Sequence, residues 1–138
     1  MKNNQAASFV MIMIIVGLTS LLLSIAIKQI IKIQISDNES NAAGTLKLIS
    51  TAMENYADAH QGAYPKAVSA LTQTNPVYID KNYISLSPIK GYNYSCSRLE
   101  PAGYSCSASP AKCSQTGKTT YTITTGGALA SQECSAME

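Results

Sequence analysis

Residues 9–27 read FVMIMIIVGLTSLLLSIAI, and no charged residue occurs between Lys2 and Lys28. An α-helix over this stretch rises about 28 Å, close to the roughly 30 Å thickness of the hydrocarbon core of a bilayer. The stretch is therefore long and apolar enough to span a membrane. We expect it to hold the protein in a membrane or to pack it into an assembly.

A cleaved secretory signal is the alternative, because Ser24 and Ala26 supply small residues before a possible cut. The apolar stretch is longer than the core of a typical signal. A cut after Ala26 would also leave a run of isoleucines in water: Ile27, Ile30, Ile31, Ile33 and Ile35. These residues favour a segment that is retained and that continues as a helix, with Lys28 and Lys32 on its polar side.

A second helical pattern follows the polar interruption Ser36–Ser40, which together with Gly44 could bend or fray the helix. From residue 41 to residue 61, apolar residues recur at steps of three and four and form one stripe: Ala42, Leu46, Ile49, Met53, Tyr56 and Ala57. Glu54 and Asp58 lie on the opposite, polar side. Gly62 is a plausible helix stop.

Strand-like segments dominate the rest of the chain, after a possible short helix over 65–72 and a loop over 75–88. The predicted strands are 91–97, 104–107, 119–124 and 128–130, with a tight turn at Gly126–Gly127. One face of this antiparallel sheet is the obvious partner for the apolar stripe. The sequence therefore predicts an α+β fold, in which a long N-terminal helix packs on a small antiparallel sheet.

Four cysteines lie after residue 95, and they favour two disulfides in an exported domain. The sequence contains no C-x-x-C pair, which zinc sites commonly use, and His60 is the only histidine. Of three connectivities, we favour Cys96–Cys106, which would join the strands on either side of a turn, and Cys113–Cys134, which would close a loop around the third strand. The sequence leaves the other two open. Lys28 and Lys32 argue against export of the residues that follow the apolar stretch, because positive charges tend to stay in the cytoplasm. Long domains, however, cross the membrane regardless of flanking charge.

Other functions have little support in the sequence. The net charge of +2 and the scattered basic residues exclude a nucleic-acid binder that works by neutralising phosphates. Asp80, Glu100 and Glu133 are too dispersed to indicate a calcium site. We expect no cofactor, no metal and no catalytic residues, and His60 is interpreted as a helix-end residue. The tyrosines near the sheet are interpreted as half-buried rather than as an adhesive face: Tyr78, Tyr83, Tyr92, Tyr94 and Tyr104.

The chain resembles the type IV pilins and the type II secretion pseudopilins over most of its length, from about residue 2 to residue 130. A short leader with Lys2 precedes the apolar helix, and LKLISTAMENYADAHQGAYPKAVSAL (46–71) resembles a characteristic block of that family. The later pieces NPVYIDKNY, GYNYSCS and TYTITTGG are similar to its C-terminal sheet.

The resemblance implies a structural subunit that is inserted in the bacterial inner membrane, with its head in the periplasm, before it joins a filament. Residues 1–8 would be a leader, 9–35 the membrane and filament-core helix, and 36–138 the exported head. A prepilin peptidase would cut between Ser8 and Phe9 and methylate Phe9. The implied partners are related subunits, reached through the N-terminal helix, and an assembly platform.

Two positions depart from the family pattern. Ser8 stands where Gly usually precedes the cut, and Met13 stands at the fifth mature position, where Glu usually meets a neighbouring subunit's amino terminus. A cut after Ala7 would instead place Ile12 there. These departures imply a minor subunit, for example at a filament tip, or an anchored periplasmic interaction module that never polymerises. The usual proline kink is also missing, so we expect an unbroken helix.

Overall fold

One long helix, α1 (Asn3–Ala59), begins the chain, and the computed structural model describes residues 3–135, with side chains from Ser8 onward. The apolar segment is unbroken, as predicted. The expected interruption at Ser36–Ser40 is wrong, because α1 runs through it and through Gly44. The separate amphipathic helix predicted over 41–61 is thus the last part of α1. The chain divides into two units, residues 1–34 and 35–138, which are described separately below.

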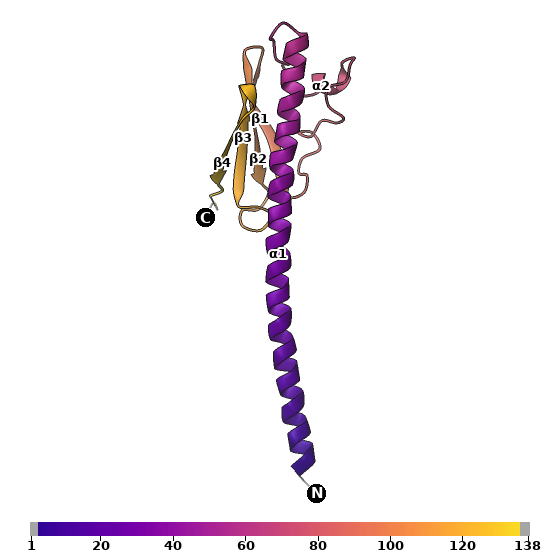
Figure 1. Cartoon of the computed structure of the whole chain (residues 1–138), viewed down its shortest axis with the longest axis vertical. Helices are drawn as coiled ribbons and strands as arrows, with labels where there is room; N and C mark the ends of the chain where they lie inside the picture. Colours follow the sequence, from indigo (N-terminus) through magenta and orange to yellow (C-terminus); the bar gives the residue numbers. More distant parts are fainter. Residues whose placement is uncertain (1–2, 136–138) are drawn as a thin grey trace. The chain divides into compact units, whose positions relative to one another are not determined.

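The second unit combines the end of α1 with a sheet of four antiparallel strands in the order β1-β2-β3-β4 (Figure 1). The strands are β1 (Tyr92–Glu100), β2 (Gly103–Pro110), β3 (Thr119–Thr124) and β4 (Ala128–Glu133), and the 3-10 turn η1 (Thr125–Gly127) joins the last two. The predicted α+β class is confirmed. Three strands are longer than predicted, and the short helix expected over 65–72 is only α2 (Ala70–Gln73).

The polar residues at the start of this unit explain why α1 is not interrupted there. The Asn38 side chain donates a hydrogen bond to the carbonyl of Thr116 (2.9 Å), and Glu39 accepts one from the amide of Lys118 (2.7 Å). Side chains that would compete with the helix backbone are thereby occupied by the loop before β3. The Ser36–Ser40 segment is the place where the helix first meets the sheet domain.

The core lies between the predicted helix stripe and one face of the sheet. Leu46, Ile49 and Met53 of α1 are fully buried. The sheet contributes Tyr92, Tyr94, Tyr104, Cys106, Ala108 and Ile123 to the same cluster, and Leu71 and Ile79 join it from the intervening segment. The helix ends as expected, since the amide of Gly62, whose φ is 84°, donates to the carbonyl of Ala57.

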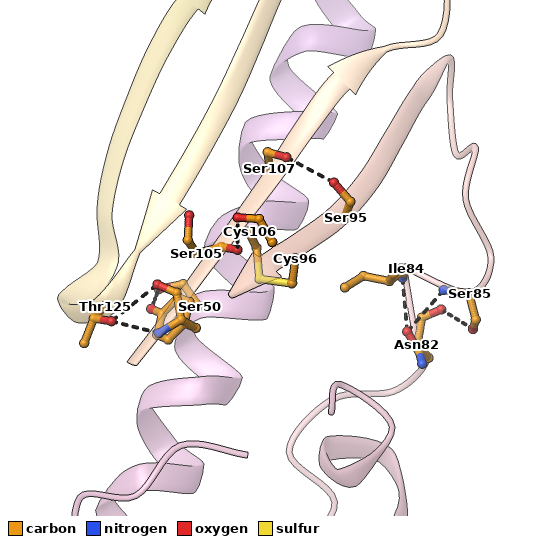
Figure 2. The surroundings of a disulfide bond; sticks show 12 residues. Ser50, Asn82, Ile84, Ser85, Ser95, Cys96, Ser105, Cys106, Ser107 and Thr125 are labelled. Carbon is orange, nitrogen blue, oxygen red and sulfur yellow. Dashed lines mark hydrogen bonds between the residues drawn. A yellow bond between two sulfur atoms is a disulfide. The ribbon is translucent and has the colours of Figure 1, made fainter. Parts of the chain in front are cut away.

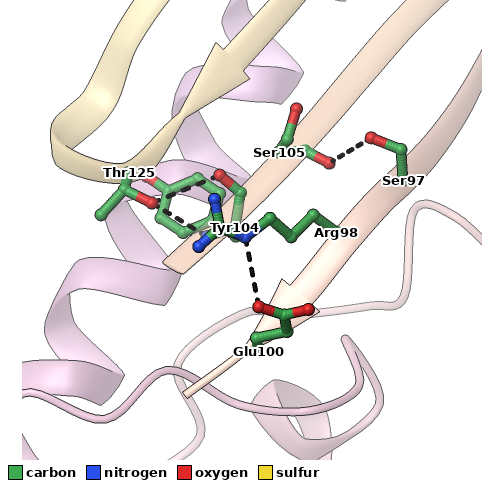
Figure 3. A network of polar contacts seen from close by, with 6 residues as sticks. All are labelled: Ser97, Arg98, Glu100, Tyr104, Ser105 and Thr125. Carbon is green, nitrogen blue, oxygen red and sulfur yellow. Dashed lines mark hydrogen bonds and ion pairs between the residues drawn. The ribbon is translucent and has the colours of Figure 1, made fainter. Parts of the chain in front are cut away.

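A β-bulge divides β1 into two halves of different phase. Cys96 pairs with Cys106, but Arg98 pairs with Ser105, so Ser97 is the extra residue. Because side chains alternate along a strand, the bulge turns Leu99 toward the core and Arg98 away from it. Figure 3 shows Arg98 on the outer side, where its guanidinium lies 3.4 Å from the Glu100 carboxylate. Without the bulge, Arg98 would face the helix.

Two disulfides, Cys96–Cys106 and Cys113–Cys134, are present, and they are the two connectivities favoured from the sequence. The first joins directly opposed residues of β1 and β2, with 3.9 Å between their Cα atoms (Figure 2). The second joins the loop before β3 to the residue after β4. Every residue of β4 is exposed, so β4 is held by its pairing with β3, by η1 and by this second disulfide.

We predict that replacing Cys113 and Cys134 together by serine lowers the free energy of unfolding by about 3 kcal/mol, the entropy expected for a loop of this size. The amides of β4 should then exchange hydrogen much faster, while those of β1 and β2 should not. Urea unfolding and hydrogen exchange of the full chain in detergent test this. The matched control is the Cys96→Ser, Cys106→Ser variant, which should leave β4 exchange unchanged; equal loosening of β4 in both variants would contradict the assignment.

Candidate functional site

The first candidate site is the apolar surface of α1 within residues 8–34, where every side chain is exposed. The exposed fractions include 65% for Phe9, 60% for Met13 and 62% for Ile33. An exposed apolar surface of this extent marks contact with lipid or with other proteins. By length and composition α1 could cross a membrane, with a mean hydropathy of 2.7 in its most apolar window, a test that a signal sequence near the N-terminus also passes.

Three hydroxyl groups in the middle of this apolar surface are satisfied by the helix itself. Thr19 donates to the carbonyl of Val16 (3.0 Å), Ser20 to that of Gly17 (2.9 Å) and Ser24 to that of Ser20 (2.9 Å). Hydroxyls that bond to a preceding turn can be placed in hydrocarbon without an unpaired polar group. The surface therefore suits lipid or the dry interior of a helix assembly equally well.

The residues that the family resemblance singles out lie on this surface. Ser8, Phe9 and Met13 are all exposed residues of α1, and the helix begins before them, at Asn3. The bond between Ser8 and Phe9 thus lies within a helix. Met1 and Lys2 of the expected leader lie outside the described residues.

The other residues considered from the sequence have structural surroundings. His60 follows the end of α1 and stacks on Tyr56, with ring centroids 3.8 Å apart. Tyr92 and Tyr104 are buried toward the helix, and burial raises the pKa of each to about 12. Among residues 3–135, no three His, Cys, Asp or Glu side chains lie together as metal ligands would.

The second candidate site is a polar cluster that the sequence did not indicate, here called the Glu54 anchor: Ser50, Glu54, Tyr64, Tyr104 and Gly126. Glu54 accepts hydrogen bonds from the Tyr64 hydroxyl (2.7 Å), the Tyr104 hydroxyl (2.9 Å) and the Gly126 amide (2.8 Å). These donors come from the loop after α1, from β2 and from η1. One carboxylate of α1 therefore ties three other segments of the domain to the helix.

The direction of each bond in the anchor follows from its proton count. Tyr104 has one hydroxyl proton, which it donates to Glu54, so the buried Ser50 hydroxyl donates to the Tyr104 oxygen over 2.7 Å. The backbone of Tyr104 is fixed as well, because Thr125 accepts from its amide and donates to its carbonyl (Figure 3). Every polar group of the anchor thus has a partner.

Burial raises the pKa of Glu54, but the hydrogen bonds from Tyr64, Tyr104 and the Gly126 amide lower it, and the net result is below its usual value. Such a carboxylate stabilises the fold above its unfolded-state pKa, and the stabilisation is lost as the pH falls through the folded-state pKa. The sequence offered no signal for this, since Tyr104 lies 50 residues further along the chain.

We predict that Glu54→Gln lowers the free energy of unfolding at neutral pH by about 2 kcal/mol, since hydrogen bonds to charged groups are lost. Its stability should also change less than that of the unmodified protein when the pH falls below about 4, the range in which a glutamate is protonated. Urea unfolding of the full chain in detergent, followed at several pH values, measures both effects.

The matched control is Asp58→Asn, one turn further along α1 at an exposed position. It should leave both the neutral stability and the acid dependence unchanged. Tyr104→Phe should cost a similar amount to Glu54→Gln, because it leaves the buried Ser50 hydroxyl without its acceptor. Equal losses in the Glu54 and Asp58 variants would contradict the anchor.

Comparisons with protein-family models, with curated proteins and with solved structures find no match for this chain.

Proposed function

We propose that the protein is a structural subunit of a filament of the type IV pilus or type II secretion kind. It would be held in the inner membrane by the apolar part of α1 before assembly, and that part would later pack against the same part of related subunits. Its partners would be those subunits, a prepilin peptidase and an assembly platform. In this role the protein has no catalytic activity.

The observation that carries the proposal is the continuity of α1. Its first part exposes an apolar surface in which the hydroxyls of Thr19, Ser20 and Ser24 are bonded to the helix itself, and its last part packs against one face of the sheet. A subunit that must move from lipid into a protein filament needs a helix that is stable in both surroundings. A separate domain that is already folded around the end of that helix can make the same move unchanged.

The two disulfides support the exported placement of the sheet domain, because disulfides persist in oxidising compartments such as the periplasm. The Glu54 anchor stabilises the domain without any other subunit. The sheet domain could therefore fold before assembly and afterwards cover the outside of a filament.

A permanently anchored interaction module is the second candidate, and Met13 favours it. The described part of the apolar segment has no carboxylate with which to meet the amino terminus of a neighbouring subunit. A charge in an apolar environment is retained only where it has a partner. A chain without it could remain in the membrane as an anchor, or could occupy a filament end where no such partner is needed.

We predict that the protein isolated from its host begins at Phe9 with a methylated amino group. Mass spectrometry of the N-terminus, applied to membrane and sheared surface fractions, tests this. Ser8→Gly should raise the cleaved fraction, because it restores the usual residue before the cut, whereas the matched change Ser20→Gly should not. An intact Met1 in every fraction would support the anchored module, and a start at Ile27 would support a secreted domain.

We also predict that Met13→Glu increases the amount of this subunit along the filament shaft, because it restores the usual charged contact between neighbours. Immunogold labelling of filaments measures the position and density of the subunit. Met11→Glu is the matched control, since it adds the same charge at an equally exposed position on a different side of the helix. Similar labelling for all three proteins would contradict the explanation of Met13.

A further inference from the structure

The two disulfides differ in how well the protein covers their cysteines. Cys106, in the first disulfide, is 1% exposed and belongs to the core between the helix and the sheet. Cys113 and Cys134, in the second, are both only half-buried. A disulfide is broken by a thiolate that must reach one of its sulfur atoms, so access decides which bond can be exchanged. Only in the second disulfide are both cysteines partly exposed.

An open groove leads to the second disulfide. It has a volume of about 560 Å³, and both Cys113 and Cys134 line it. Ser109, Thr120 and Gln132 line it as well. These three residues lie on the face of the sheet that is turned away from the helix, because they alternate along their strands with residues that face the core. A thiol can therefore approach this bond from the outer side of the sheet.

The first disulfide is protected by what its leaving group would meet. Cys96 lines a smaller cavity, of about 230 Å³, together with Leu99. Attack at Cys96 would release Cys106 as a thiolate inside the apolar core. Apolar surroundings raise the pKa of a thiol, and a thiol with a raised pKa is a slow leaving group. Exchange at this bond is therefore disfavoured even where one sulfur can be reached.

The backbone around Cys113 and Cys134 is held by bonds that do not involve sulfur. The loop that carries Cys113 is closed by a hydrogen bond from the amide of Ser114 to the carbonyl of Gly117 (2.7 Å), and the amide of Cys134 donates to the carbonyl of Lys118 (2.8 Å). The carbonyl oxygen of Cys134 also lies 3.1 Å from Cys113 Sγ, where a reduced thiol could donate a weak hydrogen bond. The two thiols would thus stay close together, and the bond could form again.

We propose that the Cys113–Cys134 disulfide is a site of thiol–disulfide exchange with a dithiol, whereas Cys96–Cys106 is a permanent bond. One thiolate of the dithiol attacks a sulfur of the exposed disulfide, forms a mixed disulfide and releases the other cysteine as a thiolate. The second thiolate of the dithiol then attacks the mixed disulfide and releases the remaining cysteine. The protein disulfide gains two electrons, the dithiol is oxidised to its own disulfide, and the two protons that it loses reach the protein thiols through water.

The consequence of this exchange lies at β4. When the bond is open, β4 is held by its pairing with β3 and by η1, while β1 and β2 keep their covalent link. Exchange would therefore loosen the last strand without unfolding the domain. The dithiol can be a small molecule or the C-x-x-C motif of another protein, since both present two thiols to one disulfide. None of these steps requires a filament or a membrane, so exchange is independent of the function proposed above.

Timed reduction of the full chain in detergent with dithiothreitol tests the selectivity. Free thiols are alkylated at intervals, the remaining disulfides are reduced and alkylated with an isotopically heavy reagent, and mass spectrometry gives the reduced fraction of each cysteine. Cys113 and Cys134 should be reduced about tenfold faster or more than Cys96 and Cys106. Equal rates, as expected if reduction requires unfolding of the whole domain, or faster reduction of Cys96–Cys106 would overturn the proposal.

A variant that narrows the groove provides the second test. Ser109→Phe adds a ring beside the second disulfide and should slow its reduction several-fold. Ser107→Phe is the matched control, because Ser107 lies two residues earlier on the same face of β2, is also half-buried and does not line the groove. Equal slowing in both variants, or none in Ser109→Phe, would contradict an attack through the groove. The rate for Cys96–Cys106 in the same samples verifies the fold of each variant.

A third measurement distinguishes the two sources of the dithiol. Reduced thioredoxin, a protein with a C-x-x-C motif, takes the place of dithiothreitol. Selective reduction by both reagents would assign the site to protein dithiols as well, and selective reduction by dithiothreitol alone would assign it to small ones. Oxidised glutathione, added after removal of the dithiol, should restore the Cys113–Cys134 bond, and a failure to restore it would contradict a site of reversible exchange.

Discussion

The structure depends on one constraint, which is that a single helix must satisfy two surroundings. From Ser8 to Gln34 the side chains of α1 are exposed, whereas from Ile35 onward one face of the helix packs against the core of the sheet domain. The backbone hydrogen bonds are the same in both parts, and only the side chains differ. In the first part, the hydroxyls of Thr19, Ser20 and Ser24 bond to the helix backbone, which suits an apolar environment. In the second part, the apolar stripe is buried against the sheet.

Polar contacts determine where the sheet domain begins and how it is oriented on its own part of the helix. Asn38 and Glu39 bind the loop before β3 at one end, and the Glu54 anchor binds β2, η1 and the loop after α1 at the other. The apolar stripe between these two places provides burial, which is not directional. The hydrogen bonds at its two ends fix the register of the helix against the sheet.

Much of this architecture follows from local patterns, and these predicted it well. The apolar run, the helix stripe that ends near Gly62 and the alternation in Tyr92, Tyr94 and Cys96 each depend on neighbours in sequence. The interruption at Ser36–Ser40 was wrongly predicted, because its polar side chains find partners near residue 117. The sequence pattern assigned Glu54 to the polar side of the helix, because its partners Tyr104 and Gly126 are also distant in sequence. The bulge at Ser97 lengthens β1 beyond its alternating part, so periodicity ended the strand too early.

The Cys113–Cys134 disulfide encloses β3, η1 and β4, and this has a consequence for the order of events during biogenesis. If the domain is exported as proposed, its two cysteines can be joined only after all three elements have reached the same oxidising compartment. In the proposed exported subunit, the bond would therefore form only once the chain has been translocated beyond residue 134. A chain that lacked this bond would have its β4 held only by β3 and η1, so the last step of folding and the formation of the disulfide are coupled.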